Sequence, residues 1–166
     1  MSVTKLPDIM IEPAVRAALL EDLGRAGDVT SEGVIPPDAQ ASLVLNAREE
    51  GVLAGLDFAR IAFHLIDPEI SFQPVLQDGA ALAPGAEIAR IAGNARALLS
   101  GERVALNFLG HLSGIASATN GIARAIAHTR ARISCTRKTT PGLRFAEKYA
   151  VRAGGGANHR FGLDDA

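Results

Sequence analysis

The chain has 166 residues, a formal net charge of −1 and 48% apolar residues, a composition that excludes an intrinsically disordered protein and supports one large or two small domains. Its balanced charge argues against a nucleic-acid binder, and its single cysteine fits a reducing compartment. No apolar run approaches the roughly 18 to 20 residues that a membrane span needs. We therefore expect a cytoplasmic protein without nucleic-acid or membrane partners.

The first part of the chain mixes helical and strand patterns. Residues 12–23 predict a helix with Pro13 in its first turn and Gly24 as its end. The stretch 21–32 has helix-end and turn chemistry, with Thr30 and Ser31 as helix caps. Strands are expected at 41–49 and 69–75, a helix at about 57–65, and hairpin-like turns at 78–93. These elements predict a small α/β sandwich domain.

Long helices follow from Ala95. Gly114 is expected to bend or break the helical run before a second helix that reaches about His128. A buried strand, a helix and a glycine turn are then expected at 131–136, 142–153 and 154–156. A helix between strands is typical of a parallel α/β sheet or barrel.

The fold class is therefore predicted as α/β, with an N-terminal sandwich domain in 1–112 and the beginning of an incomplete, TIM-like barrel in 113–166. One or two parallel strands cannot close a barrel, and an open parallel edge promotes aggregation. We expect the chain to be the N-terminal portion of a longer protein, or to have this edge covered by a partner chain.

The charges are unevenly distributed. Residues 132–160 hold seven cations and one acid, Glu147, for a formal charge of +6, whereas the remainder of the chain carries −7. A local positive field in an otherwise acidic protein suits a small anionic ligand better than a long polyanion. The alternative is a solvated basic surface.

Within this basic segment, "TRKTT" follows a predicted strand. The guanidinium of Arg137 offers a planar fork for a carboxylate or phosphate, and the ammonium of Lys138 acts as a compact point charge. Thr136 and the next two threonines add hydroxyl groups. Ligands of α/β folds bind at the carboxyl ends of strands, although an ordinary loop with exposed cations explains the pattern equally well.

Two further candidates carry positive charge or a titratable ring. "GGGANHR" lacks the spacing of a dinucleotide or P-loop site, but its glycines allow close backbone approach and are followed by His159 and Arg160. Arg103 lies at the margin of an apolar helical stripe, where it either reaches across an interface or snorkels to water. Cys135 is expected to be structural, and Asp164 and Asp165 lack partners at metal-ligand spacing.

Four motifs in order, "ALLEDLGRAGDVTSE", "GERVALNFLGHLSGIAS", "TRKTTPGLR" and "KYAVRAGGGANHRFGL", resemble the quinolinate phosphoribosyltransferases, the decarboxylating nicotinate-nucleotide pyrophosphorylases. The resemblance implies an enzyme that joins quinolinate to phosphoribosyl pyrophosphate in de novo NAD biosynthesis. Its products are nicotinate mononucleotide, carbon dioxide and pyrophosphate. It also implies a homodimer with shared active sites, and Mg²⁺ as cofactor.

The same resemblance assigns roles to six residues. Arg103 would bind quinolinate from the neighbouring subunit, Arg137 would hold a carboxylate, and Lys138 would be the catalytic residue near the ribosyl donor. Thr136, His159 and Arg160 would complete the substrate pocket. The acids that approach the metal are expected beyond Ala166. A related pyrophosphorylase with another substrate and a non-catalytic, dimerising or anion-binding chain are the alternatives.

Overall fold

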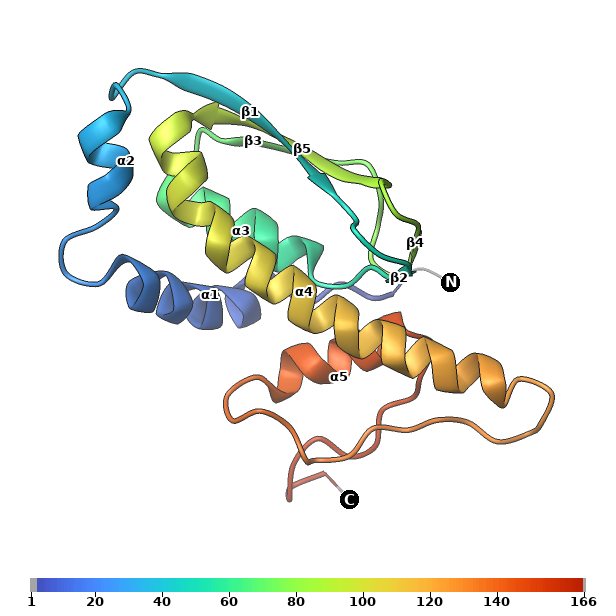
Figure 1. Ribbon diagram of the computed structural model, residues 1–166. Helices are drawn as coiled ribbons and strands as arrows, with labels where there is room; N and C mark the ends of the chain where they lie inside the picture. The colour runs from blue at the N-terminus through green and yellow to red at the C-terminus, as the bar shows by residue number, and fades with distance from the viewer. Residues whose placement is uncertain (1–2, 166) are drawn as a thin grey trace.

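The computed structural model describes residues 3–165, which form helices and small sheets (Figure 1). The helices are α1 (Asp8–Leu23), α2 (Val29–Val34), α3 (Leu56–Ile66), α4 (Ala95–Ala125) and α5 (Arg144–Ala153). The strands are β1 (Gln40–Asn46), β2 (Gly51–Val52), β3 (Ser71–Pro74), β4 (Ala81–Leu82) and β5 (Glu87–Asn94). This mixture confirms the predicted α/β class.

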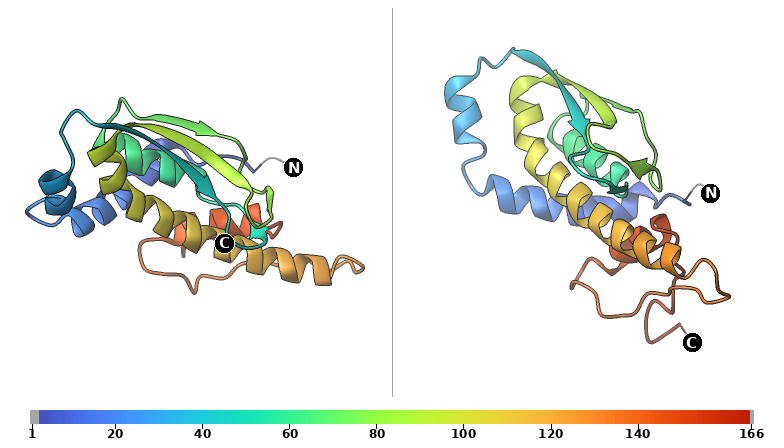
Figure 2. Two further views of the ribbon diagram at one scale, coloured as in Figure 1. Left: turned by 45° about the horizontal axis from the view of Figure 1, so that its top comes forward. Right: turned by 45° about the vertical axis from the view of Figure 1, so that its right-hand side comes forward.

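The main sheet has β5 at its centre, with β1 and β3 antiparallel to it on either side. Along β5, Ala89 and Ile91 are buried whereas Arg90 and Ala92 are exposed, the period-two alternation of a sheet with one covered face. β2 and β4 form a second, two-stranded ladder. The sheet curves over α3 and α4 and so forms one layer of a sandwich with them (Figure 2).

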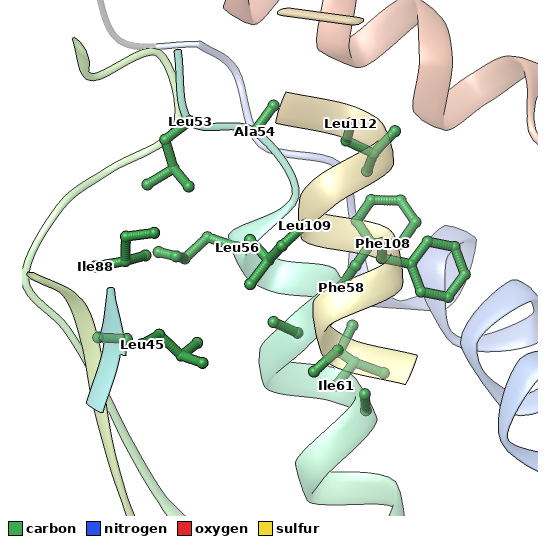
Figure 3. Close-up of a cluster of buried hydrophobic side chains, with 14 of the residues drawn as sticks. Leu45, Leu53, Ala54, Leu56, Phe58, Ile61, Ile88, Phe108, Leu109 and Leu112 are labelled. Carbon is green, nitrogen blue, oxygen red and sulfur yellow. The ribbon is translucent and has the colours of Figure 1, made fainter. Parts of the chain in front are cut away.

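The core lies between this sheet and the two helices. Figure 3 shows Leu45 and Ile88 extending from the strands toward the apolar side chains of α3 and α4. The ring of Phe58 on α3 lies 5.1 Å from that of Phe108 on α4 and 6.0 Å from that of Phe145 on α5, centroid to centroid. α5 is thereby joined to the same core.

α4 is one continuous helix of 31 residues, so the predicted break at Gly114 is wrong. A glycine in a helix interior costs only about 1 kcal/mol relative to alanine. Leu112 and Ala116 are fully buried on either side of Gly114, and burial of this continuous face outweighs that cost. The predicted domain boundary between 112 and 113 falls inside this helix.

The region of α1 and α2 also differs from expectation. α1 begins at Asp8, so Pro13 lies inside the helix rather than in its first turn, whereas Gly24 ends the helix with a φ of 57°, as predicted. Residues 29–34 form the helix α2, where helix-end and turn chemistry was expected. Its N-cap is Asp28, whose carboxylate accepts from the backbone of Ser31 at 3.0 Å and from its hydroxyl. Thr30 and Ser31 lie within the helix and are not its caps.

The last part of the chain lies on the side of α4 opposite the sheet (Figures 1 and 2). Instead of a regular strand at 131–136, a single parallel bridge joins Ser134 to Ala157. Cys135 N donates to Ala157 O at 3.1 Å, and Ala157 N donates to Ile133 O at 2.9 Å. This parallel pairing, with α5 as its crossover helix, is the start of the predicted barrel. None of the helices in residues 3–165 is both long and apolar enough to cross a membrane.

Candidate anion-binding site

The parallel bridge brings five of the six predicted site residues onto neighbouring segments. Thr136, Arg137 and Lys138 follow directly after the bridged residues of one segment, and His159 and Arg160 follow after the bridged Ala157 of the other. Because the pairing is parallel, both segments leave the bridge in the same direction. The cations of both segments therefore emerge at the same edge.

The Thr136–Lys138 turn is closed by local hydrogen bonds. Lys138 N donates to Thr136 Oγ1 at 3.1 Å, and Thr139 N donates to Arg137 O at 3.1 Å. Thr136 and Lys138 are exposed, whereas Arg137 is half-buried and its Nε is buried without a hydrogen-bond partner among residues 3–165. A buried guanidinium donor without an acceptor is costly, and an anionic ligand would satisfy it.

The single acid of the basic segment is already engaged. Glu147 accepts from Thr140 N at 3.2 Å and from His111 Nε2 at 3.0 Å. Burial raises the pKa of Glu147, but these hydrogen bonds outweigh it, so the net pKa is below its ordinary value. Within the described residues, neither Arg137, Lys138, His159 nor Arg160 forms an ion pair.

Arg144, at the start of α5, forms a hydrogen bond to each of the two segments. Its Nε donates to Thr139 Oγ1 at 3.2 Å and its Nη1 donates to Phe161 O at 3.2 Å. Its guanidinium also lies 6.0 Å from the centroid of the Phe161 ring, within the range of a cation–π contact. In the sequence, Arg144 is one of the seven cations of the basic segment, and no motif distinguishes it.

Lys148 on α5 is the second residue that the sequence analysis missed. It is 3% exposed, and its Nζ donates to Cys135 Sγ at 2.9 Å and to His159 O at 2.8 Å. Helical periodicity places the apolar face of α5 on its alanines at 146, 150 and 153, and Lys148 falls outside that stripe. No pattern in the sequence therefore indicates that it is buried.

Arg103 lies apart from the other five residues. It is exposed on α4 and lines a cleft of about 850 Å³ between that helix, β1 and the turn after β1. Glu49, Glu50 and Glu102 line the same cleft. Within one chain, the structure does not bring Arg103 to the segments that carry Arg137 and His159.

The described residues do not fit a magnesium site. Among residues 3–165, no three His, Cys, Asp or Glu side chains are grouped closely enough to hold a metal ion. The Asp165 carboxylate accepts from Phe161 N at 2.7 Å, so it stabilises a local turn. Mg²⁺ stays a prediction.

Sequence models of one family match the chain over most of its length. The model described as "Quinolinate phosphoribosyl transferase, N-terminal domain" matches residues 28–113, and that of the C-terminal domain matches 115–166. A probable nicotinate-nucleotide pyrophosphorylase (carboxylating) from Synechocystis is 48% identical over 161 residues, which are 96% of this chain and 54% of the relative. A protein of the same name from Bacillus subtilis is 48% identical over 147 residues, 88% of this chain and 50% of the relative.

Solved structures agree with these relatives. NadC from Streptococcus pyogenes has a TM-score of 0.95 and 47% identity, over 98% of this chain and 57% of that chain. The nicotinate-nucleotide pyrophosphorylase from Francisella tularensis has a TM-score of 0.92 and 38% identity, over 100% of this chain and 59% of that chain. The fold is thus that of an N-terminal sheet domain joined to the start of an α/β barrel.

The chain belongs to the quinolinate phosphoribosyl transferase family, as the resemblance of its four motifs implies. It spans about half the length of the curated relatives that it matches.

Proposed function

We propose that the protein carrying this chain transfers the phosphoribosyl group of phosphoribosyl pyrophosphate to quinolinate. The products are nicotinate mononucleotide, carbon dioxide and pyrophosphate, in a step of de novo NAD biosynthesis. Family membership supports this activity, and the observation that carries it is the unsatisfied Nε of Arg137 beside cations that have no acid partner among residues 3–165.

The charge of quinolinate matches this arrangement. Its two adjacent carboxylates repel each other and are strongly hydrated, so a site must offer several fixed cations to replace the water. Arg137 presents a bidentate fork for one carboxylate, and His159 and Arg160 lie on the neighbouring segment for the other. Lys138, exposed at the rim, provides positive charge for the phosphoribosyl donor.

The chemistry requires no protein nucleophile. The pyridine nitrogen attacks C1 of the ribosyl group, and pyrophosphate leaves with the electrons of the broken bond. The ring nitrogen is then cationic and stabilises the carbanion that forms when the adjacent carboxylate leaves as carbon dioxide, after which a proton takes its place. The protein contributes by positioning the reactants and by electrostatic stabilisation.

The position of Arg103 favours a homodimer with shared sites. Its exposed guanidinium lines a cleft away from the other candidate residues, so it reaches quinolinate only if a second copy presents its own Arg137 segment there. A cytoplasmic location stays a prediction, because plant relatives carry names that place them in chloroplasts or mitochondria.

The activity is tested on the complete protein that carries this sequence. Incubation with carboxyl-labelled quinolinate, phosphoribosyl pyrophosphate and Mg²⁺ should release labelled carbon dioxide and form nicotinate mononucleotide. Product from another pyridine acid but not from quinolinate would instead favour a related pyrophosphorylase. If neither quinolinate nor another pyridine acid gives product, the alternative of a non-catalytic, anion-binding chain is favoured.

The site is tested by calorimetric titration of the chain with quinolinate. Arg137→Ala should weaken binding by about tenfold or more, because a hydrogen bond to a charged group contributes about 1.5–3 kcal/mol. Arg132→Ala, an exposed arginine in the same basic segment, is the matched control and should change affinity by no more than about twofold. If both variants bind alike, Arg137 is an ordinary loop cation.

Shared sites are tested by mixing inactive variants of the complete protein. Arg103→Ala and Arg137→Ala should each abolish activity. If each site combines Arg103 of one copy with Arg137 of the other, random re-assortment restores about a quarter of the wild-type activity, because half the dimers then hold one intact site of two. A mixture of Arg137→Ala with His159→Ala should stay inactive, since both changes fall on the same side of each site. Recovery in neither mixture would contradict the shared site.

A further inference from the structure

Among the residues that the structure describes, the buried Lys148 has no carboxylate partner. Its side chain is 3% exposed, and no acid in residues 3–165 lies within ion-pair distance of its Nζ. Its two acceptors are Cys135 Sγ at 2.9 Å and His159 O at 2.8 Å. Burying an ammonium group costs several kcal/mol unless it is well paired, and sulfur is a weak acceptor. Packing alone therefore does not account for a lysine at this position.

The acceptors of Lys148 are also joined to each other. His159 N donates to Cys135 Sγ at 3.3 Å, and the thiol of Cys135 lies 3.6 Å from Asn158 Oδ1, to which it donates. Cys135, the ammonium of Lys148 and the backbone of His159 thus form a closed triangle of contacts, here termed the sulfur node. It joins three pieces of chain: the segment before Thr136, α5, and the segment after the glycine turn.

The sulfur node lies between the two groups of candidate ligands. Cys135 directly precedes Thr136–Lys138, and His159 is itself the first residue of the His159–Arg160 pair. Within residues 3–165, the β-pairing between these segments is the isolated bridge at Ser134 and Ala157, which ends before either group begins. The sulfur node therefore joins the two segments beyond the bridge, directly beside the residues that carry the cations.

We propose that Lys148 and Cys135 are positioning residues that fix the Arg137 segment relative to the His159 segment, so that both carboxylates of quinolinate are bound at once. The proposal rests on the proposed function. Neither side chain is required to touch the substrate, because Lys148 acts through the carbonyl of His159 and through the sulfur that precedes Thr136.

The node is measured first without ligand, by amide hydrogen exchange of the isotopically labelled chain. Lys148→Met keeps an unbranched side chain but removes the donor, and Cys135→Ala removes the acceptor. Each should accelerate exchange at His159 N by about tenfold. Cys135→Ala removes the acceptor of this amide, and Lys148→Met removes the donor that holds its segment in place. Cys135→Ser retains an acceptor and should restore most of the protection. Ser134→Ala, an exposed neighbour outside the node, is the control and should match the wild type.

The same variants are then titrated with quinolinate. Lys148→Met and Cys135→Ala should each weaken binding by about tenfold, with Cys135→Ser and Ser134→Ala close to the wild type. The unfolding midpoint in urea is followed in parallel, because replacing a buried ammonium by an apolar side chain is often neutral or stabilising. Lost affinity at unchanged stability distinguishes positioning from a merely structural role.

Cys135 is the only cysteine of the chain, which allows the node to be broken without mutation. Methyl methanethiosulfonate forms a disulfide with this sulfur and releases methanesulfinate, so a methylthio group replaces the thiol hydrogen and occupies space beside Lys148 and His159. The modified chain should show the same faster exchange at His159 as Cys135→Ala. This measurement keeps the proposal testable if a variant fails to fold.

Two results would overturn the proposal: unchanged His159 exchange in Lys148→Met and in the modified chain, or faster exchange with unaltered quinolinate affinity. If the wild-type chain binds no quinolinate, the proposed function fails separately, and the exchange result decides whether the node holds the two segments.

Discussion

The region from Asp8 to Ala125 and the region after it are stabilised in different ways. In the first, apolar residues of the sheet, α3 and α4 form a continuous core. In residues 126–165, every buried residue lies on α5 or directly after it, and the flanking segments are held by polar contacts. The first region is a scaffold, whereas the second presents its candidate cations, of which Arg137 is half-buried, on loops fixed by one helix. Such an arrangement suits ligand binding, because binding residues lie disproportionately on loops that a rigid scaffold positions.

The largest expected effect concerns the core of the scaffold. Leu112 on α4 is fully buried, and its truncation in Leu112→Ala should lower the free energy of unfolding by about 3–5 kcal/mol through lost burial and a residual cavity. Leu20→Ala on α1, where the side chain is 65% exposed, is the matched control and should cost less than about 0.5 kcal/mol. Urea titration measures both. Similar costs would contradict the assignment of the core to α4.

The scaffold was predicted from sequence better than the candidate site. Burial of one face gives α3 a clear periodicity, and the predicted strands at 41–49 and 69–75 and the predicted helix at 57–65 agree with β1, β3 and α3. The stretch at 78–93, expected as hairpin-like turns, instead contains most of the eight-residue strand β5. α2 was missed because its six residues are too few for a periodic pattern and its cap is Asp28. The strand at 131–136 is reduced to one bridge, since a strand forms only where neighbours extend the ladder.

Some features of the candidate site could likewise be predicted from the sequence, and others could not. The charge count locates Arg137, Lys138 and Arg160 in one basic segment, because charge is a property of the sequence. Three other features depend on residues that folding brings together. They are the burial of Lys148, the hydrogen bonds that Glu147 accepts, and the unsatisfied Nε of Arg137. A pattern within one segment cannot indicate them.

The second prediction concerns the contact between α4 and the end of α5. A Cβ on Gly154 would clash with the backbone O of Ala116 and lie 2.8 Å from Thr119 Cβ. Gly154→Ala should therefore cost about 1–3 kcal/mol, because backbone must move to relieve the overlap. Gly114→Ala is the opposite control: nothing lies within 4 Å of its Cβ position, so it should stabilise α4 by up to about 1 kcal/mol.

Hydrogen exchange of these two variants tests whether the two regions unfold separately. In Gly154→Ala, amides of residues 131–160 should lose protection while those of β5 and α3 keep theirs, since the scaffold has its own core. A uniform loss throughout the chain would mean that the two regions unfold as one unit.

The smallest effect is expected at one of the polar links between the regions, where Tyr149 of α5 donates to Asp78 Oδ2 at 2.6 Å. The same carboxylate accepts from Gly55 N at 3.0 Å and Leu56 N at 3.2 Å at the start of α3. Burial raises the pKa of Asp78 above its ordinary value of 3.8, and the three hydrogen bonds offset only part of that shift. Burial and the nearby Asp78 also raise the pKa of the Tyr149 phenol, so it remains a donor at all pH values of interest.

The sign of the pH dependence follows from these shifts. Just above pH 3.8 the folded chain retains a proton on Asp78 that the unfolded chain has released, so the contribution of Asp78 to stability falls as pH rises through its folded pKa. The difference in unfolding free energy between wild type and Asp78→Asn should therefore decline with pH across this window. Tyr149→Phe should cost about 1–2 kcal/mol near pH 7, where a partly buried carboxylate loses one of its three donors, and less below about pH 4, where the carboxyl is protonated. Equal costs at both pH values would contradict a role for the charge of Asp78 in this hydrogen bond.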